Sequence, residues 1–213
     1  MALSVPAGIT LYFCRHGETE ANVEGRFQGR TRDTPLTPKG RQESHAIARV
    51  LARDTEPGKL HFVSSPLPRA ITTMKIIRDS LDLPPDNFDT DPRLMEINLG
   101  AWDGLTHAEA RAGDPAAYDA RESDKWHVRV PGGGENYADV AARGESFVAG
   151  LTQDTFAVAH GAFNRILRGL FADMTWREMS DLDEPHGVVF RAYDRDVVQL
   201  PPRPENPFPR VAR

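Results

Sequence analysis

The stretch TLYFCRHGETEANV, residues 10–23, decides the fold class. Four residues suited to a buried strand lead directly into Arg15 and His16, and Gly17 then turns the chain. A core strand that ends in a cation and an imidazole delivers both groups to one edge of a sheet. We therefore expect residues 9–14 to form a central strand and the side chains after it to face a ligand site.

The same pattern occurs a second time in the chain. FAVAHGAFN, residues 156–164, is again an apolar strand that runs into His160 and a glycine, with a helix pattern behind it. In open α/β sheets, ligands bind beyond the carboxyl ends of the strands. If the two strands are parallel neighbours, His16 and His160 meet at that edge, where the N–H groups of the following helices also point. The pair of motifs predicts an anion site.

Arg69 is an independent indication of the same site. It lies in the first turn of the helix predicted after HFVSSP, where the helix dipole disfavours a cation by about 0.3–1 kcal/mol. An arginine there makes sense if an anionic ligand lies beside it. Arg15 is the second such cation, and both guanidinium groups are planar forks suited to phosphate or carboxylate oxygens. Each residue alone is compatible with a structural role, but their joint placement favours function.

Strand and helix patterns alternate along most of the chain, which is typical of an α/β fold with helices on both faces of the sheet. The predicted strands are 9–14, 60–64, 154–159, 187–193 and 196–200, with a weaker one near 87–91. The predicted helices are 37–53, 66–82, 135–152 and 161–173.

Two helix starts and one strand connection complete this prediction. Thr37 and Ser65 are the expected N-caps of the first two helices, each followed by a proline at the first helical position. The last two strands, joined through Asp194 and Arg195, form an expected hairpin on one edge. We therefore predict a three-layer α/β/α sandwich with a mixed, mostly parallel central sheet.

Length and composition indicate one domain. The chain has 213 residues, 39% hydrophobic and 27% charged, and we assign residues 1–200 to a single catalytic domain. Residues 103–134 interrupt the alternation with a weak helix around 106–121 and end in PGGGEN, which favours a lid or binding loop. Residues 201–213 form a proline-rich tail that we expect to be extended or disordered.

Several classes of protein are disfavoured. We find no secretory signal and no apolar run of the roughly 20 residues that span a bilayer, so we expect a cytoplasmic protein without a membrane partner. The single cysteine excludes internal disulfides and multi-cysteine metal sites. A net charge of −5 argues against a nucleic-acid partner but is compatible with a local basic pocket for a small anion. A monomer and a homodimer both remain open.

Four motifs together resemble one known family. They are RHGETEAN (15–22), SSPLPRAITT (64–73), EINLGAWDG (96–104) and VAHGAFNRIL (158–167). In this order and spacing they resemble the histidine phosphatase superfamily, the phosphoglycerate mutase-like proteins, and the similarity covers residues 10 to about 195.

The resemblance implies a two-step phosphoryl transfer on a small phosphorylated metabolite. His16 would be the nucleophile that forms a phosphohistidine, and the Gly17 carbonyl would hold its other ring nitrogen. Glu96 would protonate the leaving oxygen and later deprotonate the attacking water. No metal or organic cofactor belongs to this scheme. The residues implied around the phosphoryl group and substrate are Arg15, Arg69, His160, Asn22, Gln28 and Gly161.

The chemistry of these residue types agrees with that scheme. Phosphoryl transfer needs positioning and positive charge around the transferring oxygens. A neutral imidazole, with an ordinary pKa of about 6.5, is available as a nucleophile near neutral pH. A carboxyl group acts as an acid there only if its pKa is raised. We expect the apolar neighbours of Glu96, among them Ile97 and Trp102, to desolvate it in part.

Other nucleophiles and metals match the sequence poorly. Cysteine phosphatases need an arginine six residues after the cysteine, whereas Glu20 stands six after Cys14, so we assign Cys14 to packing. A zinc site on His16 and His160 lacks the HExxH pattern and would face two arginines. The G-x-S-x-G elbow of serine hydrolases is absent.

The sequence is compatible with three functions. A phosphatase acting on a small phosphomonoester is preferred, because EINLGAWDGLTHAEA (96–110) resembles the phosphatase branch of the family. A 2,3-bisphosphoglycerate-dependent phosphoglycerate mutase is the alternative. A non-catalytic phospho-ligand-binding module is third, since every expected polar residue is present.

The excursion at 103–134 is the expected source of specificity. Its basic side chains could reach a second phosphate or a carboxylate of the substrate, or they could be solvated surface charges, and both interpretations stay open. We interpret Glu135, just after the excursion, as an acidic residue that favours a helix N-terminus. The basic residues are Arg111, Arg121, Lys125, His127 and Arg129.

Overall fold

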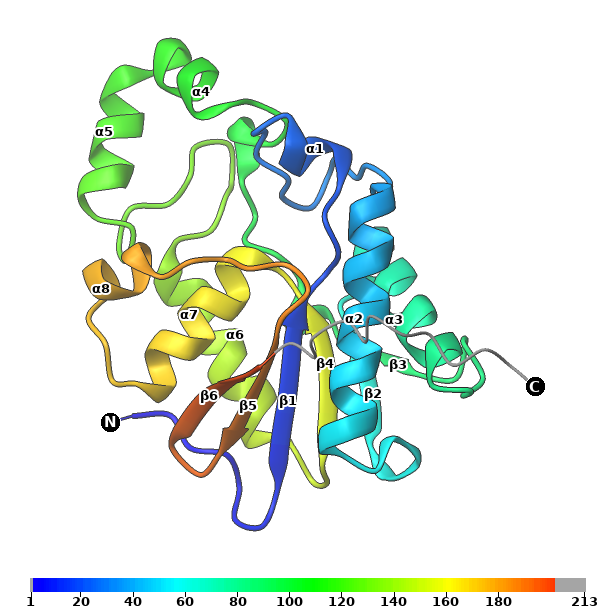
Figure 1. The fold of residues 1–213 in the computed structure, drawn as a ribbon. Helices are drawn as coiled ribbons and strands as arrows, with labels where there is room; N and C mark the ends of the chain where they lie inside the picture. The colour runs from blue at the N-terminus through cyan, green and yellow to red at the C-terminus, as the bar shows by residue number, and fades with distance from the viewer. Residues whose placement is uncertain (1, 202–213) are drawn as a thin grey trace.

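The computed structural model of the chain describes residues 2–201 (Figure 1). The predicted proline-rich tail, except Pro201, lies outside these residues. One six-stranded sheet crosses the domain, with the strand order β3-β2-β4-β1-β5-β6. Its strands are β1 (Thr10–Arg15), β2 (His61–Ser64), β3 (Asp89–Thr90), β4 (Thr155–Ala159), β5 (Val189–Tyr193) and β6 (Asp196–Leu200).

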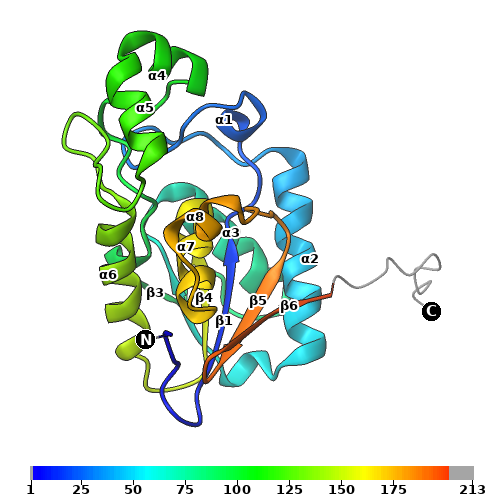
Figure 2. The same ribbon diagram turned by 90° about the vertical axis from the view of Figure 1, so that its left-hand side faces the viewer.

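Helices connect these strands and cover both faces of the sheet. In Figure 1, α6, α7 and α8 lie on one side of it and α2 and α3 on the other, and Figure 2 again shows α6 and α2 on opposite sides. The helices are α1 (Glu20–Val23), α2 (Pro38–Asp54), α3 (Pro68–Ser80), α4 (His107–Gly113), α5 (Pro115–Ser123), α6 (Tyr137–Ala149), α7 (Gly161–Phe171) and α8 (Trp176–Asp181).

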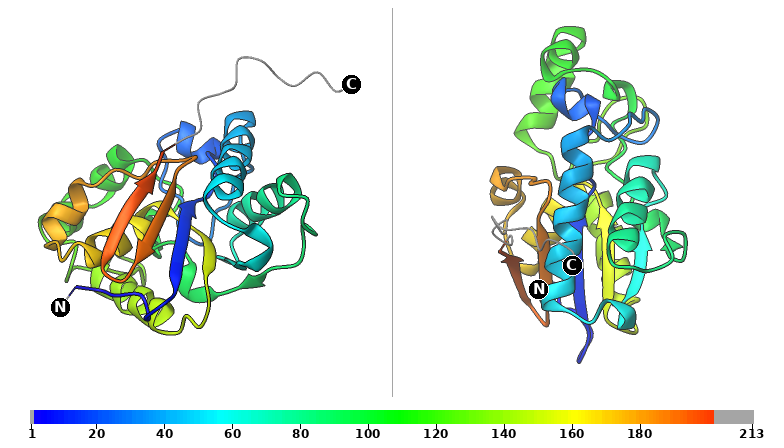
Figure 3. Two further views of the ribbon diagram at one scale, coloured as in Figure 1. Left: turned by 60° about the horizontal axis from the view of Figure 1, so that its bottom comes forward. Right: turned by 45° about the vertical axis from the view of Figure 1, so that its right-hand side comes forward.

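The sheet is mixed and mostly parallel, as predicted. β1 pairs in parallel with β4, β4 with β2, and β2 with β3. β5 runs antiparallel to both β1 and β6, and both views in Figure 3 show this orange-to-red hairpin beside the blue β1. The predicted neighbourhood of the two histidine-bearing strands is therefore confirmed.

β1 divides its side chains between two hydrophobic cores. Leu11 and Phe13 pack into the core that contains α6 and α7, while Tyr12 and Cys14 pack into the core of α2 and α3. This alternation follows from the two-residue period of a strand. Each fully buried leucine or phenylalanine stabilises the fold by about 1.5–3 kcal/mol relative to exposure. The two cores hold β1 in place and thereby position the residues that follow it.

The excursion lies beyond the carboxyl ends of the parallel strands, at the top of Figures 1 and 2. It has a small core of its own, which contains Trp102, Ala110 and Val130. Its predicted single helix is two helices, α4 and α5, because the residue before Pro115 is driven out of the helical conformation. The excursion is thus a folded cap over the sheet edge.

The start of α3 differs from the prediction. Ser65 and Pro66 were expected to begin this helix, but Leu67 is the N-cap, without a side-chain cap, and Pro68 is the first helical residue. Leu67 precedes a proline and therefore adopts an extended conformation, which delays the helix by two residues. Arg69 nevertheless falls in the first turn, as predicted. By contrast, the expected cap Thr37 begins α2, where its side chain accepts from the Gly40 N–H.

The loop after β1 passes against α2 where two glycines meet. A Cβ atom on Gly17 would overlap the Gly40 carbonyl, and one on Gly40 would overlap the backbone of Glu18. Because backbone rather than flexible side chain stands in the way, neither position has room for a side chain. This contact sets the path of the chain immediately after His16.

We expect Gly40→Ala to lower the free energy of unfolding by about 1–3 kcal/mol, the usual cost of overpacking, since the new methyl group must displace the backbone of Glu18. Urea unfolding of both proteins measures the change. Gly113→Ala is the matched control, because Gly113 is also helical and a Cβ there meets open space. Equal stability of Gly40→Ala and the wild type would contradict the packing argument.

Candidate active site

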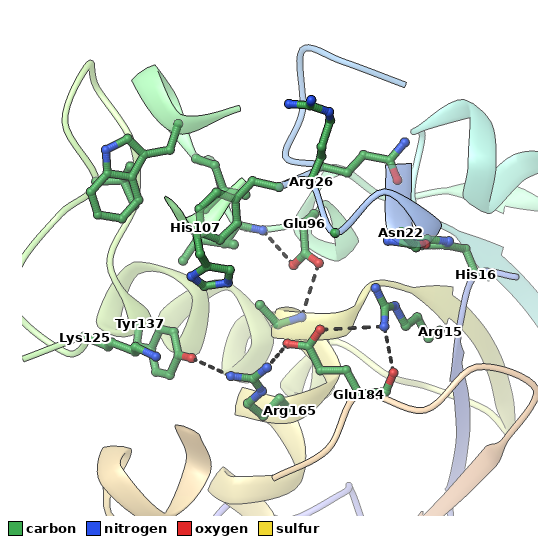
Figure 4. Close-up of a pocket in the computed structure, with 18 of the residues that line it drawn as sticks. Arg15, His16, Asn22, Arg26, Glu96, His107, Lys125, Tyr137, Arg165 and Glu184 are labelled. Atoms are coloured by element: carbon green, nitrogen blue, oxygen red, sulfur yellow. Dashed lines mark hydrogen bonds and ion pairs between the residues drawn. The ribbon is translucent and has the colours of Figure 1, made fainter. Parts of the chain in front are cut away.

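A cavity of about 500 Å³ opens between the excursion and the carboxyl edge of the sheet. Figure 4 shows its wall, with His16 and Arg15 on one side of the view and Lys125 and Tyr137 on the other. A cavity of this volume is in the range that holds a drug-sized molecule. Residues from β1, the loop before the excursion, the excursion itself, α7 and the loop before β5 all contribute to the wall.

His16 is buried and held at both ring nitrogens. Nδ1 lies 2.8 Å from the Gly17 carbonyl oxygen, to which it donates, and Nε2 accepts from Arg69 Nε–H at 3.2 Å. This pattern places the ring proton on Nδ1 and the lone pair on Nε2. The arrangement of His16 and Gly17 is the one that the sequence resemblance implied, and it leaves Nε2 as the unprotonated ring nitrogen.

His160 lies beside His16, with 5.2 Å between the ring centroids. Its Nε2 lies 2.7 Å from Ser65 Oγ, and its buried Nδ1 has no hydrogen-bond partner among residues 2–201. Burial, followed by the nearby guanidinium of Arg69, lowers the pKa of both histidines well below the ordinary value. Both imidazoles are therefore neutral near neutral pH.

Arg69 is buried, with 2% of its surface exposed. Besides its contact with His16, Nη1 pairs with Asp33 at 2.6 Å, and Nη2 donates to the carbonyl oxygens of Gln28 and Gly29. Asp33 was not identified in the sequence. An arginine this deeply buried needs a counter-charge, and Asp33 supplies it from a loop whose sequence carries no distinguishing pattern.

Glu96 is buried at the N-terminus of α7. Its Oε1 accepts from the N–H groups of Ile97 at 2.9 Å and Phe163 at 3.2 Å, and its Oε2 accepts from Ala162 N–H at 3.2 Å. Burial is the largest influence on its pKa, which is raised, and the Glu184 carboxylate adds to the effect. The direction agrees with the sequence hypothesis that Glu96 can carry a proton near neutral pH.

Asn22 and Gln28 line the cavity, as the resemblance implied. Asn22 Oδ1 accepts from the backbone N–H of Thr19 at 3.1 Å and from its hydroxyl at 2.9 Å. Gln28 Oε1 lies 2.8 Å from the same hydroxyl oxygen, whose single proton it shares with Asn22, and its amide nitrogen lies 3.2 Å from Thr34 Oγ1. Thr19 therefore holds both amide side chains at the cavity edge.

Glu184 is a site residue that the sequence did not point to. Its carboxylate lies 3.7 Å from Arg15 Nη1 and also pairs with Arg165, and Arg15 Nη1 donates to the Glu184 carbonyl at 2.7 Å (Figure 4). A Cβ atom on Gly161 would overlap Glu184 Oε2. The carboxylate thus lies over the N-terminus of α7, where an anion is favoured.

His186, from the same loop, was also missed. Its Nδ1 donates to the backbone carbonyl of His16 at 2.8 Å, and the two rings are 5.7 Å apart. Burial, with a smaller effect of Arg15, lowers the pKa of His186 to about 4. His186 therefore supports the backbone of His16 as a neutral ring.

Cys14 and Glu135, two further residues considered in the sequence, both have structural roles. Cys14 is fully buried in β1, and burial raises the pKa of its thiol, which agrees with a packing role. Glu135 is not a helix N-terminal residue, because Asn136 caps α6. Instead the Glu135 carboxylate accepts from Arg30 at 2.8 Å and from Asn98 N–H at 2.9 Å, which joins three loops around the cavity.

The basic residues of the excursion fall into two groups. Arg121 and Lys125 line the cavity. The other three are exposed and paired with neighbouring carboxylates outside the cavity wall: Arg111 with Asp119, His127 with Asp124 and Arg129 with Asp139.

Two further observations concern metals and membranes. Within residues 2–201, no group of three or more His, Cys, Asp or Glu residues is arranged to hold a metal ion. No helix in that range has both the length and the apolar character needed to cross a bilayer.

Comparisons with known proteins agree on one family. The profile of the histidine phosphatase superfamily, branch 1, matches residues 11–196. A glucosyl-3-phosphoglycerate phosphatase of Mycolicibacterium vanbaalenii is 38% identical over 202 residues, which cover 87% of this chain and 85% of that protein. The human 6-phosphofructo-2-kinase/fructose-2,6-bisphosphatase 3 is 32% identical over 184 residues, which cover 85% of this chain but only 33% of that larger protein.

Solved structures give the same result. Bacillus stearothermophilus YhfR superimposes with a TM-score of 0.74 and 32% identity, covering 88% of this chain and 94% of that one. A mycobacterial glucosyl-3-phosphoglycerate phosphatase in complex with VO3 superimposes with a TM-score of 0.70 and 32% identity, covering 86% and 90% of the two chains. The predicted fold class and family resemblance are both confirmed.

We expect Glu184→Gln to bind inorganic phosphate about tenfold more tightly than the wild type, which corresponds to about 1.4 kcal/mol. The substitution removes a negative charge from the N-terminus of α7 and releases Arg15 and Arg165 to the anion. Phosphate-dependent shifts in the thermal unfolding midpoint measure the affinity. Asp183→Asn, at an exposed neighbouring acid that pairs with Arg168, should leave it unchanged. Equal affinities for Glu184→Gln and the wild type would refute this placement of the carboxylate.

His186 makes stability depend on pH. Because its pKa is about 4 in the folded protein against an ordinary 6.5, the unfolded chain binds the proton first as the pH falls. The contribution of His186 to the free energy of unfolding is complete above pH 6.5 and is lost progressively as the pH falls to about 4. The slope is at most about 1.4 kcal/mol per pH unit. His186→Asn keeps an N–H donor but does not titrate, so its unfolding free energy should fall less steeply in urea titrations across that window. Identical slopes for the two proteins would rule out this role.

Proposed function

This chain belongs to branch 1 of the histidine phosphatase superfamily, and from that premise we propose that it hydrolyses a small phosphomonoester through a phosphohistidine on His16. The observation that carries the proposal is the state of the His16 ring. Its proton is held by the Gly17 carbonyl and its Nε2 lone pair lies at the carboxyl edge of the sheet, beside Arg69 and His160. A neutral imidazole fixed in this tautomer is a competent nucleophile.

In the first step, Nε2 of His16 attacks phosphorus, and the bond from phosphorus to the leaving oxygen breaks. Arg69 Nε–H turns from Nε2 to a phosphoryl oxygen as the new bond forms, and Arg15 neutralises a second oxygen. His160 supplies a further donor, since its buried Nδ1 has no partner within residues 2–201. Glu96 gives its proton to the leaving oxygen, which its raised pKa supports.

In the second step, water attacks the phosphohistidine. Glu96, now a carboxylate, accepts a proton from the water as the new phosphorus–oxygen bond forms, and the bond from phosphorus to Nε2 breaks. This returns His16 and Glu96 to their starting states and releases inorganic phosphate. Asn22, Gln28 and the N–H of Gly161 are the remaining proposed contacts of the phosphoryl group and substrate.

The alternatives are less well supported. Two of the relatives described above are named glucosyl-3-phosphoglycerate phosphatases, which favours hydrolysis over the mutase reaction. Retention of His16, Glu96, Arg15 and Arg69 in one place argues against a binding-only module. We propose a small phosphorylated metabolite as the partner. A cytoplasmic location, a monomeric or homodimeric state, and the absence of a metal or organic cofactor stay predictions.

Glu96→Gln should lower kcat/KM, which reports the phosphorylation step, by about 10²–10⁴-fold on an alkyl phosphate and much less on 4-nitrophenyl phosphate, whose leaving group needs no proton. In the wild type, phosphorylation by alkyl phosphates should slow as the pH rises through the raised pKa of Glu96, because only the protonated carboxyl donates. That limb should be missing from the pH–rate profile of the variant.

The phosphohistidine itself is tested by rapid acid-free quenching of enzyme mixed with labelled substrate. An acid-labile, base-stable label on the wild type, absent from His16→Ala, is the expected result. An active wild type that never acquires such a label, or equal losses of kcat/KM in Glu96→Gln on both kinds of substrate, would contradict the proposed mechanism.

A further inference from the structure

Arg121 is a buried cation in the cavity wall that has no carboxylate within ion-pair distance among residues 2–201. Only 4% of its surface is exposed, and it lies in the last turn of α5. Its Nε and Nη1 atoms are buried and make no hydrogen bond to any residue that the structure describes. Its guanidinium carbon lies 5.1 Å from the ring centre of Tyr137. This cation–π contact is weaker than the hydrogen bonds that a buried guanidinium ordinarily requires.

The other basic side chains of the cavity wall differ from Arg121 in this respect. Each of them already has a carboxylate within ion-pair distance, so their charges are balanced before any ligand enters. The pairs are Arg15 and Arg165 with Glu184, Arg26 with Glu24 and Glu109, and Lys125 with Glu122. Arg121 is therefore the position in the wall where an incoming anion would meet an uncompensated charge.

Apolar and aromatic surface also lines the cavity. The Phe27 ring stacks on Trp102 with 6.1 Å between the ring centroids, and its centroid lies 4.3 Å from that of His107. All three side chains line the cavity together with Leu99. Such a wall suits a carbon skeleton or a sugar ring, which gains from contact with aromatic faces. The skeleton between two charged ends of a ligand would lie against it.

We propose that Arg121 recognises a second acidic group on the substrate, so that the preferred substrate is a phosphomonoester with a carboxylate or a second phosphate on its carbon skeleton. This inference rests on the proposed phosphatase function and specifies its substrate class. Arg121 lines the cavity and its guanidinium makes no hydrogen bond within residues 2–201, so it can donate to one acid group, and carboxylate and phosphate both accept such bonds. Lys125, also in the wall, adds a second positive charge from the same excursion.

The test uses a series of ω-carboxyalkyl phosphates of increasing chain length, each paired with its uncharged ω-amide. For at least one chain length, the wild type should show kcat/KM about tenfold or more in favour of the acid, the usual effect of a charge-assisted hydrogen bond. Arg121→Gln should abolish most of that preference. A parallel series with a terminal phosphate distinguishes the two kinds of acid.

Arg111→Gln is the matched control, because Arg111 is an exposed arginine of the same excursion, paired with Asp119, and should keep the full preference. Binding is followed in parallel by thermal shift with the same acid and amide pairs, which needs no turnover. Absence of an acid preference at every length in both assays, or its survival in Arg121→Gln, would overturn the inference. Failure to hydrolyse any compound, with acid-selective binding retained, would instead reject the phosphatase function alone.

Stability separates recognition from a structural role. Arg121→Met replaces a buried, unpaired charge by an apolar side chain of similar length, a change that is often neutral or stabilising. We expect a thermal midpoint at or above that of the wild type. A marked fall in the midpoint, together with loss of activity on acids and amides alike, would assign Arg121 to folding rather than to substrate recognition.

Discussion

The parallel pairing of β1 with β4 is the interaction on which the site depends. Its register sets Arg15 opposite Ala159, and the ladder continues one step further, where His16 N–H donates to the Ala159 carbonyl at 3.0 Å. The two strands therefore end at the same level, and the residues after them, His16 and His160, meet although they are far apart in the chain. Burial of both faces of β1 makes a slip in this register costly, because it would turn every side chain to the wrong core.

Charge balance is the second constraint at this edge. Removing an ion from water costs several kcal/mol unless partners compensate, and the site holds buried arginines beside two buried imidazoles. The rings stay neutral, because burial and the arginines oppose their protonation. Arg69 and Arg15 each have a carboxylate, Asp33 and Glu184 respectively. The site thus keeps its positive potential without leaving these charges unpaired.

The sheet edge and the excursion contribute different parts of the cavity. The sheet edge supplies the groups proposed for phosphoryl transfer, held by short segments that follow buried strands. The excursion folds around a small core that also contains Trp102, and it adds His107, Arg121 and Lys125 to the cavity wall beside Phe27. Because that core is separate from the two cores of the sheet, changes in the excursion can alter the far wall while the strands keep His16 in place. The proposed chemistry and the proposed selectivity are therefore carried by different packing units.

The sequence by itself determined the order of strands and helices, the mixed sheet and the positions of His16, Arg69 and His160, whereas Glu96 was identified only through the family resemblance. These follow from local patterns: strand period, capping residues and motifs whose members lie within a few residues of one another. The predictions failed where two nearby residues could each play the same local role, such as Pro66 and Pro68 at the start of α3.

Only the tertiary structure decided which charges are paired. Glu184 reaches Arg15 across the sheet edge, Asp33 reaches Arg69, and Glu135 joins Arg30 to the loop at Asn98. Such pairs join segments that are distant in the sequence and follow no periodicity. The local sequence around one residue therefore does not identify its partner. For the same reason, the sequence does not distinguish Arg121 from the other basic residues of the excursion. Its burial without a partner exists only once α5 has packed over the cavity.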